Sequence, residues 1–132
     1  MVLNSNVAPG LSGTLPNSLC NLRSLQHILI YTTGALGGTI PSSLGELSSL
    51  TYMNFNARLT GPIPDAMGNL SDLAELRLFS NSRTSTLPSS LAQLQNLRYL
   101  YLPYNRLTGT IPDFFQNMSA LYYIHLQSNR FM

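Results

Sequence analysis

The chain has 132 residues, of which 44% are hydrophobic and 9% are charged, with seven Arg, no Lys and a net charge of +2. Such apolar content excludes a disordered chain, no apolar run is long enough to span a membrane, and seven scattered Arg do not make the dense basic face of a nucleic-acid binder. Cys20, the only cysteine, cannot form an internal disulfide, and the N-terminus lacks the basic and apolar regions of a signal peptide.

A unit of 23 to 25 residues repeats along the whole chain. Each unit has a proline, followed nine residues later by a leucine. These are Pro16, Pro41, Pro64, Pro88 and Pro112, and Leu25, Leu50, Leu73, Leu97 and Leu121. A period of this length predicts a solenoid whose stacked repeats bury a shared core. We divide the single domain 1–132 into a partial repeat 1–24, the repeats 25–49, 50–72, 73–96 and 97–120, and a partial repeat 121–132.

Alternating apolar positions follow each of these leucines and predict a short β-strand with one buried face. Further inward positions are Ile28, Met53, Leu76, Leu100 and Ile124, and Ile30, Phe55, Leu78, Leu102 and Leu126. The residues between them face outward, and stacking of the repeats aligns them in columns. The three outward columns are His27, Tyr52, Glu75, Tyr99 and Tyr123; Leu29, Asn54, Arg77, Tyr101 and His125; and Tyr31, Asn56, Phe79, Pro103 and Gln127.

A short helical segment is expected after each proline. Residues that favour helix N-caps follow the prolines: Asn17, Ser42, Asp65, Ser89 and Asp113. Such side chains accept hydrogen bonds from the free amides of a first helical turn. We therefore predict side-chain caps, with the apolar residues two and five positions later turned inward.

The clearest unit, LRYLYLPYNRLTGTIP at 97–112, follows the pattern LxxLxLxxNxLxGxIP. It resembles the plant-type leucine-rich repeat of receptor-like kinase and receptor-like protein ectodomains and of polygalacturonase-inhibiting proteins, and the resemblance covers essentially the whole chain. It implies an α/β fold, a right-handed solenoid forming a horseshoe segment, with a parallel β-sheet on the concave face and short helical or 3₁₀ turns on the convex face. It also implies that Asn6, Asn81, Asn105 and Asn129 lie inside the turns and bond to the backbone of neighbouring repeats.

Several positions depart from this pattern. Thr33 and Ala57 or Arg58 stand where Asn is expected, Arg83 replaces a Leu and Ser85 replaces a Gly. The cysteine-paired caps of the family are absent at both ends. We therefore expect the chain to be a fragment, or an incomplete or divergent gene product, whose uncovered ends promote self-association.

The outward columns carry the candidate ligand-binding residues. Six of the seven Tyr lie on or beside this face, and Tyr and Arg are enriched at binding hot spots, although Tyr is also a good strand former. The candidates are Tyr52, Glu75, Arg77, Phe79, Tyr99, Tyr101, Tyr104, Tyr123 and His125. Receptors of the family often seat the acidic end of a peptide on basic strand residues, which implies that role for Arg77.

Two further sets of residues lie away from the strands. Arg58, Arg83, Arg106 and Arg130 follow the strands and predict a basic edge, which either binds an anionic partner or is a solvated rim. The sequons at Asn69 and Asn117 predict N-glycosylation on the helical side. Glycosylation and the family resemblance both favour an extracellular or cell-surface location.

Threonines form two more columns: Thr14, Thr39, Thr86 and Thr110, and Thr60, Thr84 and Thr108. Regular T-x-T on a flat sheet resembles ice-binding surfaces, and some plant antifreeze proteins belong to this repeat family. The LTGxIP consensus also produces threonine at these positions.

We predict that the chain is not an enzyme and binds no metal or cofactor. His27 and His125 lie four repeats apart, and no Ser/His/Asp set, phosphate loop or metal cluster occurs. The leading hypothesis is that the concave face of a receptor or inhibitor ectodomain recognises a protein or peptide, for which an anionic ligand is a candidate. No contact with nucleic acid or with a membrane is expected. The alternatives are an ice-binding or cell-wall polysaccharide-binding protein, and a structural fragment without a ligand of its own. A pure scaffold would not need the aromatic columns.

Overall fold

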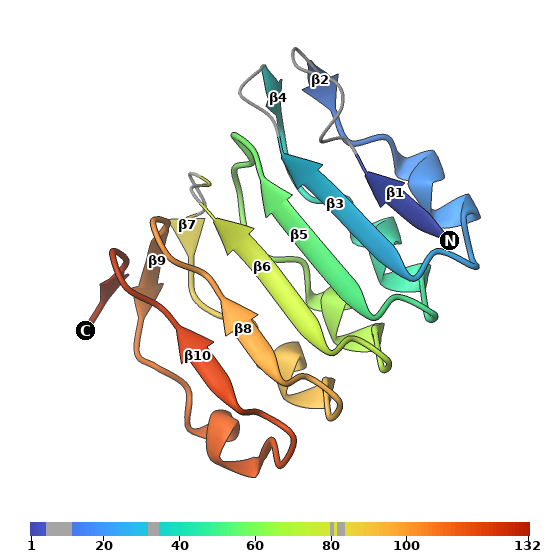
Figure 1. The fold of residues 1–132 in the computed structure, drawn as a ribbon. Coiled ribbons are helices and arrows are strands. Elements are labelled where there is room, and N and C mark those ends of the chain that lie inside the picture. The colour runs from blue at the N-terminus through green and yellow to red at the C-terminus, as the bar shows by residue number, and fades with distance from the viewer. Residues whose placement is uncertain (5–11, 32–34, 80, 82–83) are drawn as a thin grey trace.

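The computed structural model describes residues 1–4, 12–31, 35–79, 81 and 84–132. Its main sheet is parallel, and sequence-adjacent repeats contribute adjacent strands (Figure 1). The strands, in order across the sheet, are β1 (Val2–Asn4), β3 (His27–Tyr31), β5 (Tyr52–Asn56), β6 (Glu75–Phe79), β8 (Tyr99–Tyr101) and β10 (Tyr123–His125). Equivalent residues pair across the strands, as Tyr52 does with Glu75 and Glu75 with Tyr99. This register confirms the predicted columns.

Shorter strands follow the concave strands and form two small parallel sheets, which the sequence analysis did not anticipate. One sheet pairs β2 (Gly13–Thr14) with β4 (Leu36–Gly37). The other has the order β11-β9-β7, with β7 (Thr84–Ser85), β9 (Arg106–Gly109) and β11 (Arg130–Phe131). These strands are two to four residues long, too short to show an alternating pattern.

Each repeat turns on its convex side through a five-residue 3₁₀ helix. The helices are η1 (Asn17–Asn21), η2 (Ser42–Glu46), η3 (Asp65–Asn69), η4 (Ser89–Gln93) and η5 (Asp113–Asn117). The expected side-chain caps are wrong, because the proline occupies the N-cap position and no side-chain cap bond forms. The Leu44 amide instead donates to the Pro41 carbonyl over 3.1 Å. An i→i+3 bond thus already occupies the amide that a side-chain cap would use.

The core lies between the main sheet and the 3₁₀ helices. Leu76 and Leu100 are fully buried, as their column predicted, but Ile124 at the last strand is 36% exposed. A solenoid residue is covered by its neighbours on both sides, and β10 has a neighbour on one side only. Leu3 in β1 is likewise partly exposed. Self-association through such surfaces stays a prediction.

Asparagines inside the turns bind the backbone of adjacent repeats, which confirms the implied ladder. Asn81 accepts a hydrogen bond from the Leu59 amide over 3.1 Å, and its Nδ2 donates to the carbonyls of Phe55 and Phe79. The side chains of Asn105 and Asn129 bond to the Leu102 carbonyl and other backbone groups. Asn6, Thr33 and Arg83 lie outside the described residues.

Ser85 occupies a position where other repeats have glycine with positive φ. Its φ is 141°, against 77° at Gly38, 72° at Gly61 and 84° at Gly109. An L side chain is strained in this region, at a cost of about 1–3 kcal/mol. The replacement of the expected glycine by Ser85 therefore leaves this turn with a strained backbone.

Ser85→Gly should raise the free energy of unfolding by about 1 kcal/mol, because relief of strain exceeds the entropy that a glycine adds to the unfolded chain. Urea unfolding of the variant and the parent measures the difference. The reverse change, Gly109→Ser, should destabilise by about 2 kcal/mol, since a Cβ there would lie 2.8 Å from the Thr86 methyl. An unchanged midpoint for both variants would show that the turn carries no strain.

Candidate ligand-binding face

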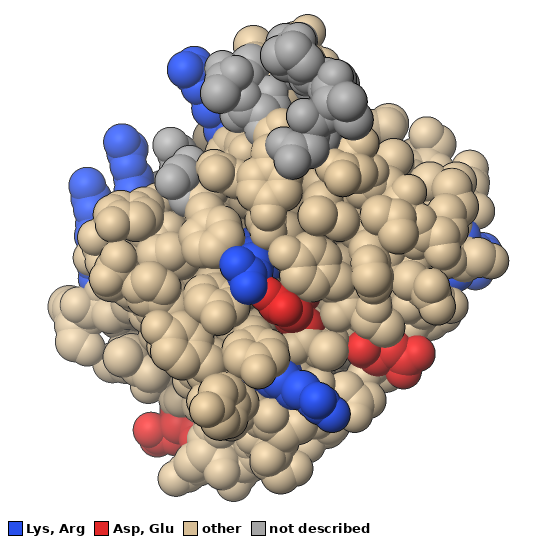
Figure 2. Space-filling view, viewed as in Figure 1, with Lys and Arg blue, Asp and Glu red and all other residues tan. Residues whose placement is uncertain are grey.

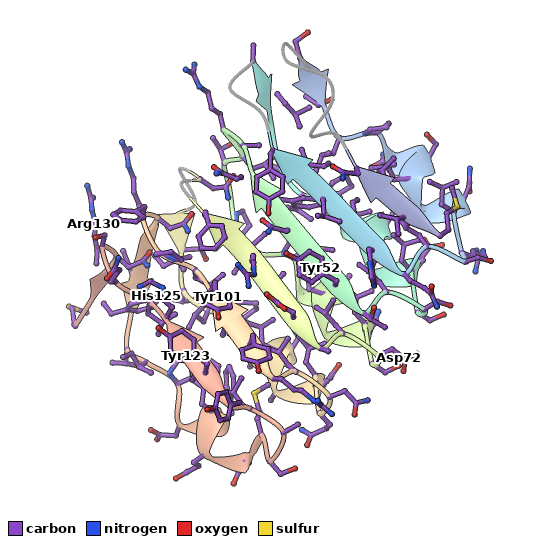
Figure 3. The ribbon with its side chains drawn as sticks, viewed as in Figure 1. Tyr52, Asp72, Tyr101, Tyr123, His125 and Arg130 are labelled. Atoms are coloured by element: carbon purple, nitrogen blue, oxygen red, sulfur yellow. The ribbon has the colours of Figure 1, made fainter. Side chains whose placement is uncertain are left out.

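The outward side chains of β6, β8 and β10 form one aromatic group, here called the Tyr101 cluster (Figure 3). Its members are Phe79, Tyr99, Tyr101, Tyr123 and His125. The Tyr101 ring centre lies 6.0 Å from that of Phe79, 5.3 Å from Tyr123 and 6.2 Å from His125, and it stacks on Tyr99 at 6.4 Å. Aromatic pairs attract one another at these separations. The structure thus brings four other predicted site residues into contact with the Tyr101 ring.

Arg77 joins this cluster to the polar centre of the face. Its guanidinium carbon lies 4.4 Å from the centre of the Tyr101 ring, a cation–π geometry, and its Nε donates to Glu75 Oε1. Partial burial acts to lower the pKa of Arg77, but the hydrogen bond and the negative charge of Glu75 outweigh it and raise the pKa. The Arg77 side chain remains 32% exposed, and Figure 2 shows a blue and a red side chain in contact near the centre of this face. A fixed cation is therefore available beside the aromatic rings.

Asn54 lies in an outward column but is fully buried, because two tyrosines cover it. Its Nδ2 donates to the hydroxyl of Tyr31 over 2.5 Å and to that of Tyr52 over 2.9 Å. Burial and the neighbouring Tyr52 raise the pKa of Tyr31, so its phenol stays neutral. Tyr52, a predicted ligand contact, is thus already hydrogen-bonded within the chain, whereas Tyr123 of the Tyr101 cluster is 44% exposed.

Sequence reasoning missed three residues of this face. Tyr31 and Asn54 belong to the outward columns. A column predicts in which direction a side chain points, but it does not predict which side chains it contacts. Tyr122 precedes β10, is 80% exposed and packs edge-on against Tyr99 at 5.8 Å. Tyr122 belongs to none of the outward columns, so the repeat pattern did not predict its place on this face.

The basic edge lies apart from this cluster. Arg58 is exposed in the loop after β5, and Arg106 and Arg130 are exposed at the first positions of β9 and β11. Arg83 falls outside the described residues. Tyr104 is exposed beside Arg106 and not on the strand face. In the part of the chain that the structure describes, no three His, Cys, Asp or Glu side chains gather as metal ligands would.

A family model described as a leucine-rich repeat region matches residues 10–130. The chain belongs to the leucine-rich repeat family. None of the curated protein sequences compared with it matches.

Solved structures of plant leucine-rich repeat proteins are similar over nearly the whole chain. One is the plant peptide hormone receptor RGFR1 in complex with RGF2, with 34% identity, a TM-score of 0.88, and coverage of 98% of this chain and 21% of the receptor. The BIR3–SERK2 complex from Arabidopsis thaliana has 30% identity, a TM-score of 0.82, and coverage of 100% and 68%. A plant ice-binding protein has 31% identity, a TM-score of 0.87, and coverage of 99% and 42%. The chain thus spans about a fifth of the hormone receptor's length.

The sequon residues of this leucine-rich repeat chain lie on its convex side. Asn69 ends η3 and Asn117 ends η5, and both are exposed. Their glycosylation stays a prediction. Among the described residues, no helix is both long and apolar enough to cross a bilayer.

Proposed function

We propose that this chain is a non-catalytic recognition module of a receptor or inhibitor ectodomain and binds a peptide or protein on its concave face, at the cell surface or outside the cell. The observation that carries the proposal is the Tyr101 cluster with Arg77 against it. Tyrosines offer large contact areas with few torsions to immobilise, and a hydroxyl that orients the ligand. The similar receptor RGFR1 was solved with RGF2 bound, which supports a peptide as the ligand.

Arg77 favours a ligand with an acidic group. Its Nε is occupied by Glu75 and its plane rests on Tyr101, so the guanidinium is held in one orientation. The terminal N–H groups of an Arg bind a carboxylate in a bidentate manner. A ligand carboxylate would therefore dock beside the Tyr101 ring.

Acid–base catalysis has little support on this face. A general acid or base must stand within hydrogen-bond reach of a reacting group, usually with a second group to position it. Glu75 is engaged by Arg77, and His125 packs against Tyr101 and Tyr123. His27 lies on β3, three strands away from β8. These placements support binding without chemistry.

Tyr101→Ala should weaken binding at least about thirtyfold, the effect of a hot-spot truncation of about 2 kcal/mol. The binders are peptides selected from a phage-displayed random library against the parent chain, and their affinities are measured by calorimetry. The melting temperature should fall by only a few degrees, because the Tyr101 ring packs against other outward side chains and not in the core between the sheet and the 3₁₀ helices. Gln93→Ala, an exposed change on the convex η4, is the control and should alter neither quantity.

Hydrogen exchange on the same complexes provides an independent outcome. Protection should appear at β8 and β10 when a selected peptide binds. Protection confined to the convex 3₁₀ helices, together with full affinity in Tyr101→Ala, would refute the concave site.

Ice binding is the second candidate function. The similar plant ice-binding protein and the exposed threonines favour it. These threonines also have a structural role, because the methyls of Thr14, Thr39 and Thr86 occupy the space beside Gly38, Gly61 and Gly109 in the following repeats. The packing alone is a sufficient reason for small β-branched residues in that column.

If the threonine columns bind ice, the purified chain should inhibit ice recrystallisation, and Thr110→Tyr should abolish the effect by disrupting the flat surface. Ser119→Tyr, an equally exposed change on the convex side, should leave inhibition intact. Splat-cooling microscopy measures crystal size. A parent chain without inhibition would remove this candidate and leave peptide recognition untouched.

A further inference from the structure

His125 of the Tyr101 cluster is an imidazole that the recognition of one acidic group by Arg77 does not use. It pairs in register with Tyr101, which in turn pairs with Arg77. Its ring lies edge-on to those of Tyr101 and Tyr123, with ring centres 6.2 Å apart in both pairs (Figure 3). Because Arg77 rests on the same Tyr101 ring, the three side chains form one row across β6, β8 and β10, here called the Arg77–His125 row.

One end of this row carries a permanent charge and the other end a conditional one. An arginine stays protonated throughout the physiological range of pH, whereas a histidine ordinarily gains its positive charge between about pH 8 and pH 5. When His125 is protonated, the row presents two cations, one on each side of Tyr101. When His125 is neutral, Arg77 alone is charged.

No carboxylate side chain in the described ranges complements the charge of a protonated His125. The imidazole contacts the tyrosine rings, Tyr101 from β8 and Tyr123 from its own strand. Glu75, the acid of the outward columns, is bonded to Arg77. The other acids lie on the 3₁₀ helices or in the loop after η3: Glu46, Asp65, Asp72 and Asp113. The remaining titratable side chains on or beside β8 to β11 are all arginines or tyrosines: Arg98, Tyr99, Tyr104, Arg106, Tyr122 and Arg130.

A ligand with two acidic groups complements the doubly charged row. The cations on either side of Tyr101 repel each other, and a bound anion offsets this repulsion where the chain supplies no acid of its own. The backbones of Arg77 and His125 are two strand spacings apart, about 10 Å. Three residues of an extended peptide cover about the same length. Acidic residues at positions i and i+3 of a ligand that crosses Tyr101 therefore reach both ends of the row.

We propose that His125 is a second anion-binding group of the concave site, which selects a peptide with two acidic residues and binds it more tightly as the pH falls. The inference rests on the proposed recognition of a peptide by the Tyr101 cluster. Arg77 holds one carboxylate at either pH, and His125 holds the other only when it is protonated. Protonation and ligand binding therefore favour each other, and the complex takes up a proton when it forms within the range where the histidine titrates.

The test uses peptides selected at about pH 5.5 from a phage-displayed random library against the parent chain, with affinities measured by calorimetry at about pH 5.5 and pH 8. The Asp and Glu side chains of a peptide are ionised at both values, so a difference reports on the protein. The parent should bind about tenfold more tightly at the lower pH, as expected for one added charge-assisted hydrogen bond. Replacing the second acidic residue of the peptide by its amide should remove the difference.

Variants of the two histidines on this face assign the effect. His125→Asn should bind equally at both pH values, with the weaker affinity of the parent, and His125→Arg should bind tightly at both because its charge is permanent. His27→Asn is the matched control, since His27 begins β3 in an outward column and packs on Tyr52 with ring centres 5.8 Å apart. It should retain the full pH dependence of the parent.

The outcomes separate this inference from peptide recognition itself. Equal affinity of the parent at both pH values, the same loss of pH dependence in His27→Asn and His125→Asn, pH-dependent binding by His125→Arg, or an undiminished effect with the amide peptide would each overturn the role of His125. If Tyr101→Ala still weakens binding in those cases, the concave site stands without it. Full affinity of Tyr101→Ala for the selected peptides would overturn the concave site and the role of His125 together.

Discussion

Leu100→Ala should lower the free energy of unfolding by about 2–5 kcal/mol, the range for a leucine truncated in a packed core. Leu100 is fully buried in β8, paired in register with Leu76 on one side and Ile124 on the other. The cavity would therefore interrupt the contacts of three successive repeats. A solenoid is stabilised by its nearest-neighbour interfaces, so a central break affects cooperativity as well as stability.

Thermal unfolding followed by circular dichroism measures the effect, and the midpoint should fall by many degrees. Ile111→Ala is the matched control, because it truncates an aliphatic side chain that is 55% exposed. We expect a loss below about 1 kcal/mol there. A Leu100→Ala variant that melts within a degree or two of the parent would show that this column does not form the core.

Asn81→Ala should destabilise the chain by about 3 kcal/mol. The Asn81 side chain is 3% exposed and satisfies three backbone groups in two repeats. Its removal leaves the Leu59 amide and two carbonyls without partners, and each buried polar group left unpaired costs about 1–3 kcal/mol. Entry of water into the space limits the sum.

Asn69→Ala is the control for this variant, since the same truncation on the exposed end of η3 should cost less than about 0.5 kcal/mol. Urea unfolding compares the two. Native-state hydrogen exchange adds a local readout, because the Leu59 amide should lose its protection in Asn81→Ala first. Equal stability of the two variants would contradict the structural role of the ladder.

The sequence by itself determined the repeat period, the inward columns and the face on which the tyrosines lie. The reason is that a solenoid maps sequence period directly onto space: a residue's neighbours are the residues one repeat before and after it. The columns through Leu76 and Leu100, and the pairing of Glu75 with Tyr99, could thus be predicted before any coordinates were known. The asparagine ladder at Asn81 followed from the family resemblance.

Only the tertiary structure decided what the outward side chains do. Direction is a property of the backbone, but contact depends on side-chain length and on neighbours in other repeats. Asn54 points outward and is nevertheless buried, because Tyr31 and Tyr52 are long enough to bond to it from above. Arg77 lies against Tyr101 because adjacent strands align the two residues, while Glu75 holds the guanidinium from its own strand.

The same distinction explains the errors at the turns and ends. Side-chain caps were predicted from residue type, yet the carbonyl of Pro41 had already taken the amide of Leu44. Ile124 was assigned to the core from its column, but its burial requires strands on both sides of β10. Residue type and period therefore predict where a side chain is placed, whereas hydrogen-bond competition and the presence of a neighbouring repeat determine whether it is bonded or buried.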